Sequence, residues 1–252
     1  MAKFAAIVQA RRGSVRLPDK MMKTILGREV ILRFLERIEA AHSLDLIIVA
    51  TTDRSRDDRL VRLIETHFPE VGVFRGSEGD VLDRTYRAAV AVSTVSGEEP
   101  VVVRMTPDCP LLDPRVIDLH IEEFSRRDVD YLSSRIHKRT WPHGMELEVF
   151  TFASLKEAWL NAAEPFEREH VTPFIYRSHA HRFRLFELSH ADDLSRYRFT
   201  LDYPEDLRFI DAVYRALYPR SPLFSLTDIM TLLEDHPEIV QINAMRVDPR
   251  LE

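Results

Sequence analysis

Apolar residues in the first half of the chain alternate between short continuous runs and segments with helical spacing. The continuous runs, which are typical of strands buried on both faces of a sheet, lie at residues 4–8, 46–50, 71–74 and 101–105. Segments in which apolar residues recur every three or four positions lie between them, at residues 30–41, 59–67 and 81–95. This alternation predicts an α/β fold, with a mostly parallel central sheet and helices on both faces.

The second half of the chain has a less regular pattern. A helix is expected after Asp113, because aspartate is a good helix cap and Pro114 suits the first helical position. Strands are expected at residues 131–134, 146–150, 183–188 and 198–201, and helices at 152–161, 168–176, from the segment 202–206 to about 217, and from Ser225 onward. We see no repeat or linker, so residues 1–252 are predicted to form a single domain with a smaller, mixed subregion.

Composition and charge limit the classes of protein to which this chain can belong. The chain has 252 residues, of which 45% are hydrophobic and 30% charged, and this suits a compact fold. The net charge of -6 argues against a general binder of nucleic acid or membranes, so any basic site must be local. No signal peptide or apolar stretch of about 20 residues is recognised, and membrane insertion is not expected. The single cysteine, Cys109, excludes an internal disulfide and suits the reducing cytoplasm.

The loop after the first predicted strand is strongly basic. Four cations lie within ten residues around Gly13 and Ser14, namely Arg11, Arg12, Arg16 and Lys20. In open α/β sheets ligands bind beyond the carboxyl ends of the strands, and guanidinium groups and free backbone amides suit phosphate oxygens. The loop is neither a Walker A sequence nor GxGxxG. On charge alone, a solvated basic loop is an equal alternative.

Two aspartates are expected at the same edge of the sheet. Asp108 follows the fourth strand, and Asp202 follows the strand predicted at residues 198–201. Two carboxylates from distant segments can share a hard cation such as Mg²⁺ with phosphate oxygens. The alternative for each is an ordinary helix cap or turn residue, and Asp206 is better explained as a charge in the first turn of a helix.

Six segments occur in the order found in one known family. They are residues 9–20 (QARRGSVRLPDK), 74–77 (FRGS), 80–84 (DVLDR), 108–111 (DCPL), 168–173 (REHVTP) and 201–207 (LDYPEDL). The chain resembles the spore coat polysaccharide biosynthesis protein F family over residues 4–215, and this family is similar to the cytidylyltransferases that make CMP-Kdo and CMP-sialic acid. The resemblance implies a Rossmann-like (GT-A-like) nucleotidyltransferase fold and CTP as the donor.

The resemblance also implies roles for individual residues. Arg11 and Lys20 correspond to triphosphate contacts, with Arg16 assisting, and Asp108 and Asp202 correspond to the Mg²⁺ ligands. Arg11, Lys20 and Asp108 are therefore the expected catalytic residues.

The resemblance also implies that further residues contact the nucleotide. Gln9, Ala10 and Gly13 correspond to positions where the backbone approaches the nucleotide, and Asp80 and Arg84 to positions that face the base, ribose or acceptor. An ion pair between Asp80 and Arg84, four residues apart on a helix, is the alternative for the last two.

The acceptor side is expected in the second half. Alternation along the strand predicted at 146–150 places Glu146 and Glu148 on one face, and Glu169 and His170 open a helix beside them. The alternatives are a solvated acidic strand and a structural histidine. Three cations flank the loop before the strand and either contact an anionic substrate or form a solvated surface: Arg135, Lys138 and Arg139.

Two residues depart from the family pattern. Pro107 stands where a glycine usually precedes the metal-binding aspartate, and it removes an amide donor. Asp19 replaces the usual glycine before the loop lysine, where its charge is expected to pair with Lys20 or to repel the ligand.

The sequence therefore predicts a CTP-dependent nucleotidyltransferase that activates a sugar or sugar-acid for surface polysaccharide biosynthesis and releases pyrophosphate. A homodimer is implied, with the contact in the acceptor-side subregion at about residues 130–190. The alternatives are a glycosyltransferase of similar fold, which the absence of an Asp-x-Asp after a strand disfavours, and a non-catalytic nucleotide- or sugar-binding protein.

Overall fold

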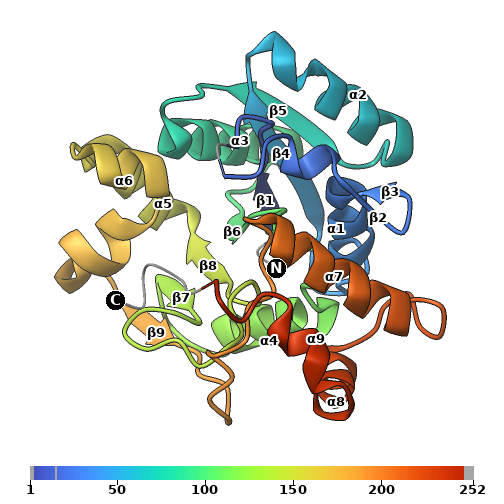
Figure 1. Ribbon diagram of the computed structural model, residues 1–252. Coiled ribbons are helices and arrows are strands. Elements are labelled where there is room, and N and C mark those ends of the chain that lie inside the picture. Colours follow the sequence, from blue (N-terminus) through green and yellow to red (C-terminus); the bar gives the residue numbers. More distant parts are fainter. Residues whose placement is uncertain (1–2, 15, 247–252) are drawn as a thin grey trace.

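A computed structural model describes residues 3–14 and 16–246. In this part of the chain one seven-stranded sheet has the strand order β5-β4-β1-β6-β8-β7-β9 (Figure 1). Its strands are β1 (Phe4–Gln9), β4 (Leu46–Thr52), β5 (Gly72–Gly76), β6 (Val101–Met105), β7 (Tyr131–Ser133), β8 (Glu148–Thr151) and β9 (Leu185–Glu187). A separate two-stranded hairpin, β2 (Thr24–Ile25) and β3 (Arg28–Glu29), was not expected from the sequence.

Strand direction separates the two halves of the sheet. The strands β5, β4, β1 and β6 are parallel, as expected for the first half of the chain. Strand β8 is antiparallel to both β6 and β7, whereas β9 is parallel to β7. Among the described strands of this sheet, only β8 therefore runs against the rest, and the predicted mostly parallel α/β fold with a mixed subregion is confirmed.

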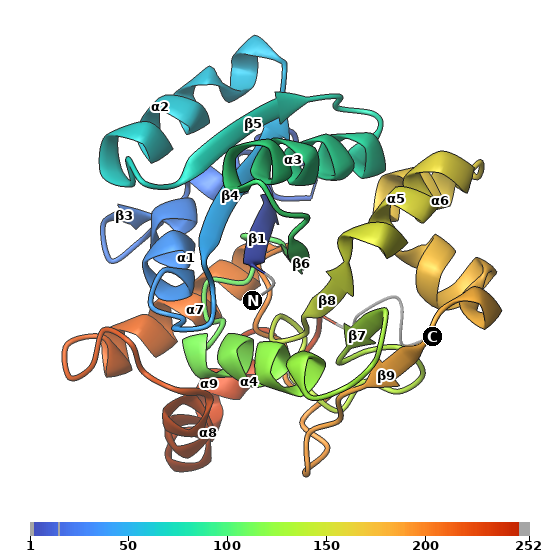
Figure 2. The same ribbon diagram turned by 180° about the vertical axis from the view of Figure 1, so that it is seen from behind.

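Helices cover both faces of the sheet. They are α1 (Val30–Ile38), α2 (Asp58–His67), α3 (Val81–Ser96), α4 (Pro114–Ser125), α5 (Phe152–Asn161), α6 (Pro165–His170), α7 (Pro204–Leu217), α8 (Leu226–Asp235) and α9 (Pro237–Gln241). Helices α1, α2, α4, α7 and α8 pack on one face, and α3 and α5 pack on the other. Figures 1 and 2 show α5 and α6 at one side of the molecule, away from α1 and α7.

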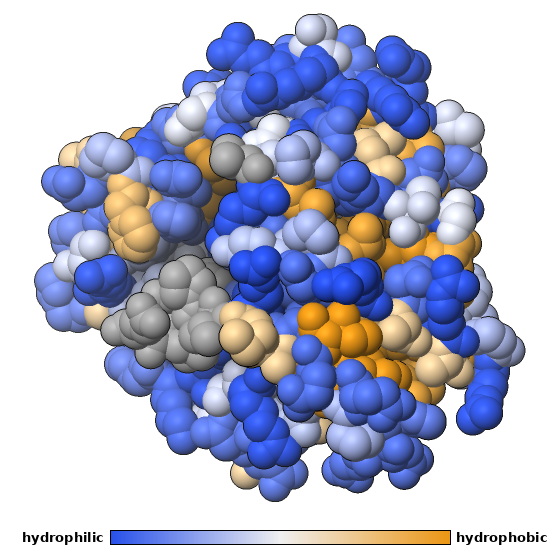
Figure 3. Space-filling view, in the orientation of Figure 1, coloured by the Kyte–Doolittle hydropathy of each residue, from blue (hydrophilic) through white to orange (hydrophobic). Residues whose placement is uncertain are grey.

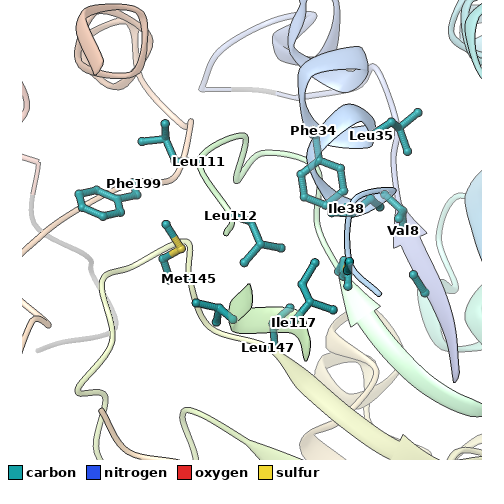
Figure 4. Close-up of a cluster of buried hydrophobic side chains, with 14 of the residues drawn as sticks. Val8, Phe34, Leu35, Ile38, Leu111, Leu112, Ile117, Met145, Leu147 and Phe199 are labelled. Carbon is teal, nitrogen blue, oxygen red and sulfur yellow. The ribbon is translucent and has the colours of Figure 1, made fainter. Parts of the chain in front are cut away.

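Alternate residues of β1 serve two hydrophobic cores. Ala6 and Val8 belong to the core under α1 and α4, whereas Ile7 belongs to the core under α3 and α5. Figure 4 shows Val8 beside the α1 side chains Phe34 and Ile38 in the first core. This double burial explains why β1 is an unbroken apolar run, since both faces of each parallel strand contact a helix layer.

The order of the strands places a switch point at β1. The chain moves from β1 outward to β4 and β5 on one side, and α3 then returns it to β6 on the other side of β1. The connections after β1 and β6 therefore leave in opposite directions. Such a point, at the carboxyl ends of parallel strands, is where open α/β sheets form a binding crevice.

The prediction of a strand at residues 198–201 is wrong. The backbone there makes one isolated bridge, between Arg198 and His143. The Phe199 amide donates to the His143 carbonyl at 2.7 Å, and the Leu201 amide donates to the Asp108 carbonyl at 2.7 Å. Because these partners lie in loops, the segment is extended and buried without being part of the sheet.

Two other elements differ from the expected boundaries. The helix predicted at 168–176 is interrupted, since α6 ends at His170 and a separate helical segment, η3, covers Phe174–Ser178. Val171 between them has a φ of 74°, which an α-helix cannot contain, and Pro173 lacks an amide donor. The strand predicted from residue 146 begins at Glu148, because the chain turns at Gly144, whose φ is 105°.

Hydrophilic residues cover most of the face shown in Figure 3. Within the described residues, none of the helices combines the length and apolar character needed to cross a membrane.

Candidate functional site

A cavity of about 380 Å³ lies beyond the carboxyl ends of β1 and β6. The loop after β1, the first turn of α3, the loop after β6, the end of α6 and the segment before α7 all contribute to its wall. Its lining residues are Gln9, Arg11, Gly13, Ser14, Arg16, Lys20, Met21, Val81, Arg84, Thr106, Pro107, Asp108, Glu169, His170 and Asp202. Five segments that are distant in sequence thus meet at the switch point of the sheet.

The Lys20 side chain lies between the two predicted metal ligands. Its ammonium is 2.6 Å from a carboxylate oxygen of Asp108 and 3.1 Å from one of Asp202. It also donates to the Leu201 carbonyl at 3.0 Å. Since Lys20 comes from the loop after β1 and the aspartates come from two other segments, this cluster fixes how the three segments meet.

The charges of this cluster alter one another's pKa. Burial alone would raise the pKa of Asp108, but the Lys20 ammonium outweighs it and lowers this pKa to about 2. Burial likewise opposes the charge on Asp202, but Lys20 keeps the Asp202 pKa below its ordinary value despite the repulsion from Asp108. The two carboxylates in turn raise the pKa of Lys20 against the effect of burial. All three groups are therefore charged at neutral pH.

A buried ion-pair network holds Asp202 in place from behind. Arg198 donates to Asp202 at 3.0 Å and to both oxygens of Asp206, which is fully buried. Asp206 also accepts from the Asp202 amide at 2.9 Å and from the Asn243 side chain at 3.0 Å. Asp206 is thus more than a charge in the first turn of α7, because it orients the segment that carries Asp202.

Further cations line the cavity near this cluster. The Arg16 guanidinium is 2.9 Å from Asp202 and about half exposed, and the Arg11 side chain is 44% exposed and lies 3.7 Å from Glu78. Arg84 is buried and donates to the Ser77 carbonyl. Burial and the nearby charge of Arg11 lower the Arg84 pKa to about 10. The cavity is therefore lined by four cations, Arg11, Arg16, Lys20 and Arg84, and by three carboxylates, Asp108, Asp202 and Glu169.

Asp19 does not pair with Lys20, so one of the two outcomes expected for it is wrong. Its carboxylate instead binds the Arg12 guanidinium at 2.9 Å, and Arg12 also donates to the Arg56 carbonyl. The backbone of Asp19 has a φ of 54°, a conformation that glycine adopts most easily and that aspartate tolerates better than most residues. The Asp19 charge is therefore paired with Arg12 and not with Lys20.

Three residues that were expected to bind the nucleotide, Gln9, Ala10 and Asp80, have different surroundings in the structure. Gln9 lines the cavity, whereas Ala10 is buried and its amide donates to the Ala50 carbonyl. Asp80 caps α3 by accepting from the Asp83 amide and forms an ion pair with Arg168. The alternative Asp80–Arg84 ion pair is not found among the described residues, and Asp80 is absent from the cavity lining.

The four expected acceptor residues separate into two pairs. Glu169 and His170, at the end of α6, line the cavity, whereas Glu146 and Glu148 are outside its lining. Glu148 accepts hydrogen bonds from Tyr131 at 2.5 Å and Thr172 at 2.6 Å, and it pairs with Arg104. Neither a solvated acidic strand nor an open acceptor contact describes Glu148.

Sequence reasoning missed Arg104, which connects this network to the cavity. Its guanidinium donates to the Gln9 side chain at 3.0 Å and pairs with Glu148. The available signal was a single arginine inside the apolar run of residues 101–105, since a charge buried in a central strand requires a partner.

Asp108 and Asp202 fit a divalent cation. Their carboxylates converge around a positive charge, the Lys20 ammonium, and oxygen donors are what Mg²⁺ prefers. In the described residues no group of three or more histidine, cysteine or carboxylate side chains could hold a metal ion alone. Two carboxylates suit Mg²⁺ in particular, since it commonly takes its other ligands from phosphate oxygens and water.

The chain is similar over nearly its whole length to proteins of known family. The cytidylyltransferase family model matches residues 5–234. An uncharacterized protein of Methanocaldococcus jannaschii is 37% identical over 96% of this chain and 95% of its own length. The spore coat polysaccharide biosynthesis protein SpsF of Bacillus subtilis is 31% identical, over 92% of this chain and 94% of its own.

Solved structures agree with this assignment. A cytidylyltransferase from Leptospira borgpetersenii superposes with a TM-score of 0.86 at 29% identity, covering 96% of this chain and 98% of its own. A CMP:2-keto-3-deoxy-manno-octonic acid synthetase complexed with CTP has a TM-score of 0.60 at 17% identity, covering 85% of this chain and 99% of its own, and shares the fold. Fold, cavity and family match together show that this chain belongs to the cytidylyltransferase family and is a CTP-dependent nucleotidyltransferase.

Proposed function

We propose that the enzyme activates a sugar or sugar-acid by transferring the CMP group of CTP to it, with release of pyrophosphate. The observation that carries this proposal is the Lys20 ammonium between Asp108 and Asp202, at the edge of a cavity rich in cations. The negative charge of a triphosphate suits these cations, and guanidinium groups bind phosphate oxygens well.

The residues that line the cavity have different roles in this mechanism. Arg11, Arg16 and Lys20 hold the triphosphate, and Gln9 and Gly13 lie where the nucleotide meets the end of β1. An acceptor oxygen attacks the α-phosphorus in line, the bond between the α- and β-phosphates breaks, and the acceptor proton passes to solvent. Positioning and the neutralisation of developing charge supply most of the rate enhancement.

Asp108 and Asp202 would hold Mg²⁺, whose chemistry here is to neutralise phosphate charge and polarise phosphoryl oxygens. Lys20 must then exchange its carboxylate contacts for phosphate contacts as CTP binds. Pro107 removes one amide donor beside Asp108, so we expect the cationic side chains to carry more of the phosphate binding.

The acceptor lies on the side of Glu169 and His170 in this proposal. These residues line the cavity from the end of α6, a different segment from the basic loop. Asp80 acts through Arg168, because their ion pair fixes α6 against the start of α3. The similarity to the Bacillus subtilis spore coat protein supports a role in surface polysaccharide biosynthesis.

We also propose a cytoplasmic homodimer formed through residues 130–190. Two large apolar side chains are exposed on this subregion, Leu160 of α5 at 62% and Phe166 of α6 at 45%. Burying them against a second copy would remove apolar surface from water. Size-exclusion chromatography with light scattering tests this, and a monomer at micromolar concentration would contradict it.

Pyrophosphate release tests the main proposal. Purified protein is incubated with Mg²⁺, one of the four common ribonucleoside triphosphates, and sugars or sugar-acids in turn. Release is expected with CTP and an acceptor together, with little from CTP alone. Equal release without any acceptor would indicate hydrolysis, and transfer from a preformed nucleotide-sugar would indicate a glycosyltransferase.

A further inference from the structure

A buried carboxylate that the proposed mechanism does not use lies behind the basic loop. Asp57, directly before α2, is fully buried. It occupies the N-cap position of α2, where an aspartate side chain usually accepts from an amide in the first turn of the helix, but it makes no such bond. Because a buried carboxylate is costly unless donors satisfy it, the groups that donate to Asp57 show which part of the fold it serves.

The Asp57 carboxylate accepts hydrogen bonds from two other segments. One oxygen accepts from the main-chain amide of Arg12, in the basic loop, at 2.8 Å. The other accepts from the hydroxyl of Thr52, at the end of β4. The guanidinium groups of Arg12 and Arg84 are near enough to interact with its negative charge. Asp57 therefore joins the basic loop to the end of β4.

Asp57 takes the place of the next main-chain acceptor in the β1–β4 ladder. These strands are parallel, and just past the end of β1 the Ala10 amide donates to the Ala50 carbonyl at 3.3 Å. The same ladder would continue with the Arg12 amide on the Thr52 carbonyl, but that carbonyl accepts from an arginine of β5. The Asp57 side chain supplies the missing acceptor and so extends the pairing into the loop.

This pairing decides which groups of the loop face the cavity. Alternate residues line it, since Gln9, Arg11 and Gly13 do so and Ala10 and Arg12 do not. The amides of Ala10 and Arg12 are bonded on the side of β4, as in an extended chain, where successive groups point in opposite directions. In the part of the chain that the structure describes, neither the Arg11 nor the Gly13 amide donates to a protein acceptor. Both amides are therefore available to phosphate oxygens.

The loop also packs directly on the connection between β4 and α2. A β-carbon at Gly13 would lie 2.9 Å from a guanidinium nitrogen of Arg56, so glycine allows this close approach. Arg56 in turn pairs with Glu78, and its carbonyl accepts from the Arg12 guanidinium at 2.9 Å. The bond from Arg12 to Asp57 is thus the buried part of a larger contact between the loop and this connection.

We propose that Asp57 is a positioning residue for CTP, which fixes the basic loop so that the Arg11 and Gly13 amides face the triphosphate. The proposal rests on the proposed binding of the triphosphate by this loop, and it adds the residue that orients the loop. Asp57 does not touch CTP and acts through the Arg12 main chain. Without it the loop must be ordered as CTP binds, and this ordering lowers the affinity.

Two substitutions separate this role from the capping of α2. Asp57→Ser supplies a good N-cap residue, but its side chain is one atom shorter and does not reach the Arg12 amide. Asp57→Asn keeps an oxygen that can accept from this amide and offers a donor to the Thr52 hydroxyl. Asp53→Ala is the matched control, since Asp53 lies in the same connection, is 66% exposed and pairs with Arg54 at 3.8 Å. Circular dichroism and thermal unfolding show whether each variant is folded.

Calorimetric titration with CTP in the presence of Mg²⁺ measures the consequence. We expect CTP to bind Asp57→Ser about 10- to 100-fold more weakly than wild type, because a hydrogen bond to a charged group and the order of the loop are lost. Asp57→Asn should stay within about threefold of wild type because it retains this bond, and Asp53→Ala should bind as wild type does. If Asp57 serves the fold alone, Asp57→Ser unfolds at a lower temperature but binds CTP with unchanged affinity, and that result would overturn the proposal.

Amide hydrogen exchange in wild type gives a second test that does not depend on the folding of Asp57→Ser. Without ligand, NMR should show the Arg12 amide protected and the Arg11 and Gly13 amides exchanging fast. CTP with Mg²⁺ should then protect the latter two. Fast exchange at Arg12, or no added protection of Arg11 and Gly13 by CTP, contradicts the positioning role. Failure of the proposed function is distinct, because it appears as no pyrophosphate release with any acceptor while CTP still protects the loop.

Discussion

Two neighbouring clusters use the same residue types for different purposes. The Lys20 cluster, made of Lys20, Asp108 and Asp202, lies in loops at the cavity. In the proposed mechanism its cation moves when CTP binds. The Glu148 cluster, made of Glu148 and its partners, lies within paired strands, and its acceptor atoms are satisfied by protein donors. Charged side chains thus become available to a ligand where the chain leaves the sheet, and become structural where strands enclose them.

The largest expected difference between the clusters is in catalysis. Asp108→Asn keeps the size of the side chain but removes the charge that faces Lys20 and would hold Mg²⁺. We expect kcat/KM to fall about 1000-fold, equivalent to about 4 kcal/mol of transition-state stabilisation. Pyrophosphate release measures this, with an unchanged circular dichroism spectrum as the control. A fully active variant would remove Asp108 from the mechanism.

The second-largest effect is expected in the stability of the fold, and it comes from the Glu148 cluster. Glu148→Ala leaves Arg104 without its carboxylate and removes the acceptor of Tyr131 and Thr172, and we expect a loss of about 3 kcal/mol in the free energy of unfolding. Urea denaturation measures it. The double change Arg104→Met with Glu148→Leu should recover part of the loss. If Glu148→Ala unfolds like wild type, the distinction between a structural and a ligand cluster fails.

Acid should weaken the Lys20 cluster over a defined range. The Asp108 pKa falls from 3.8 to about 2 in the folded protein, so this carboxylate stabilises the fold above pH 4. That contribution, about 2 kcal/mol, is lost as pH falls from about 4 to 2. Denaturation curves at several pH values should show a steeper decline for wild type than for Asp108→Asn, and parallel curves would contradict the assignment.

The smallest effect is expected at Asp19. Asp19→Gly relieves a φ of 54° but removes the partner of Arg12, and opposing terms of this kind should leave stability within about 1 kcal/mol of wild type. CTP affinity should also change little, because the Asp19 charge is paired with Arg12 and not with Lys20. A tenfold gain in CTP affinity, measured by calorimetry, would mean that Asp19 repels the ligand.

Sequence patterns predicted the parallel half of the fold well because both faces of its strands are covered. Ile7 and Val8 face different cores, and the resulting apolar run is unmistakable. The segment 198–201 alternates polar and apolar residues as a strand does, and Phe199 and Leu201 are fully buried, but its backbone pairs with loops at His143 and Asp108. The residue types of this segment indicate that it is buried, but they do not indicate which backbone groups form hydrogen bonds with it.

The site could be predicted from the sequence where a single residue acts from a fixed position in the fold. It was harder to predict where several charged side chains are available as partners for one another. The resemblance brought Lys20, Asp108 and Asp202 together, and the structure places them in contact. The pairing of Asp19 with Arg12, and the enclosure of Glu148, depend on side-chain directions that sequence spacing leaves open.

Calorimetric titration of CTP tests the central assignment most directly. Wild type is titrated with Mg²⁺ present and again with Mg²⁺ removed by EDTA, and Asp202→Asn is titrated under both conditions. The account predicts that Mg²⁺ strengthens CTP binding to wild type about tenfold or more, and that Asp202→Asn loses most of this gain. Equal CTP affinity in wild type with and without Mg²⁺ would contradict it.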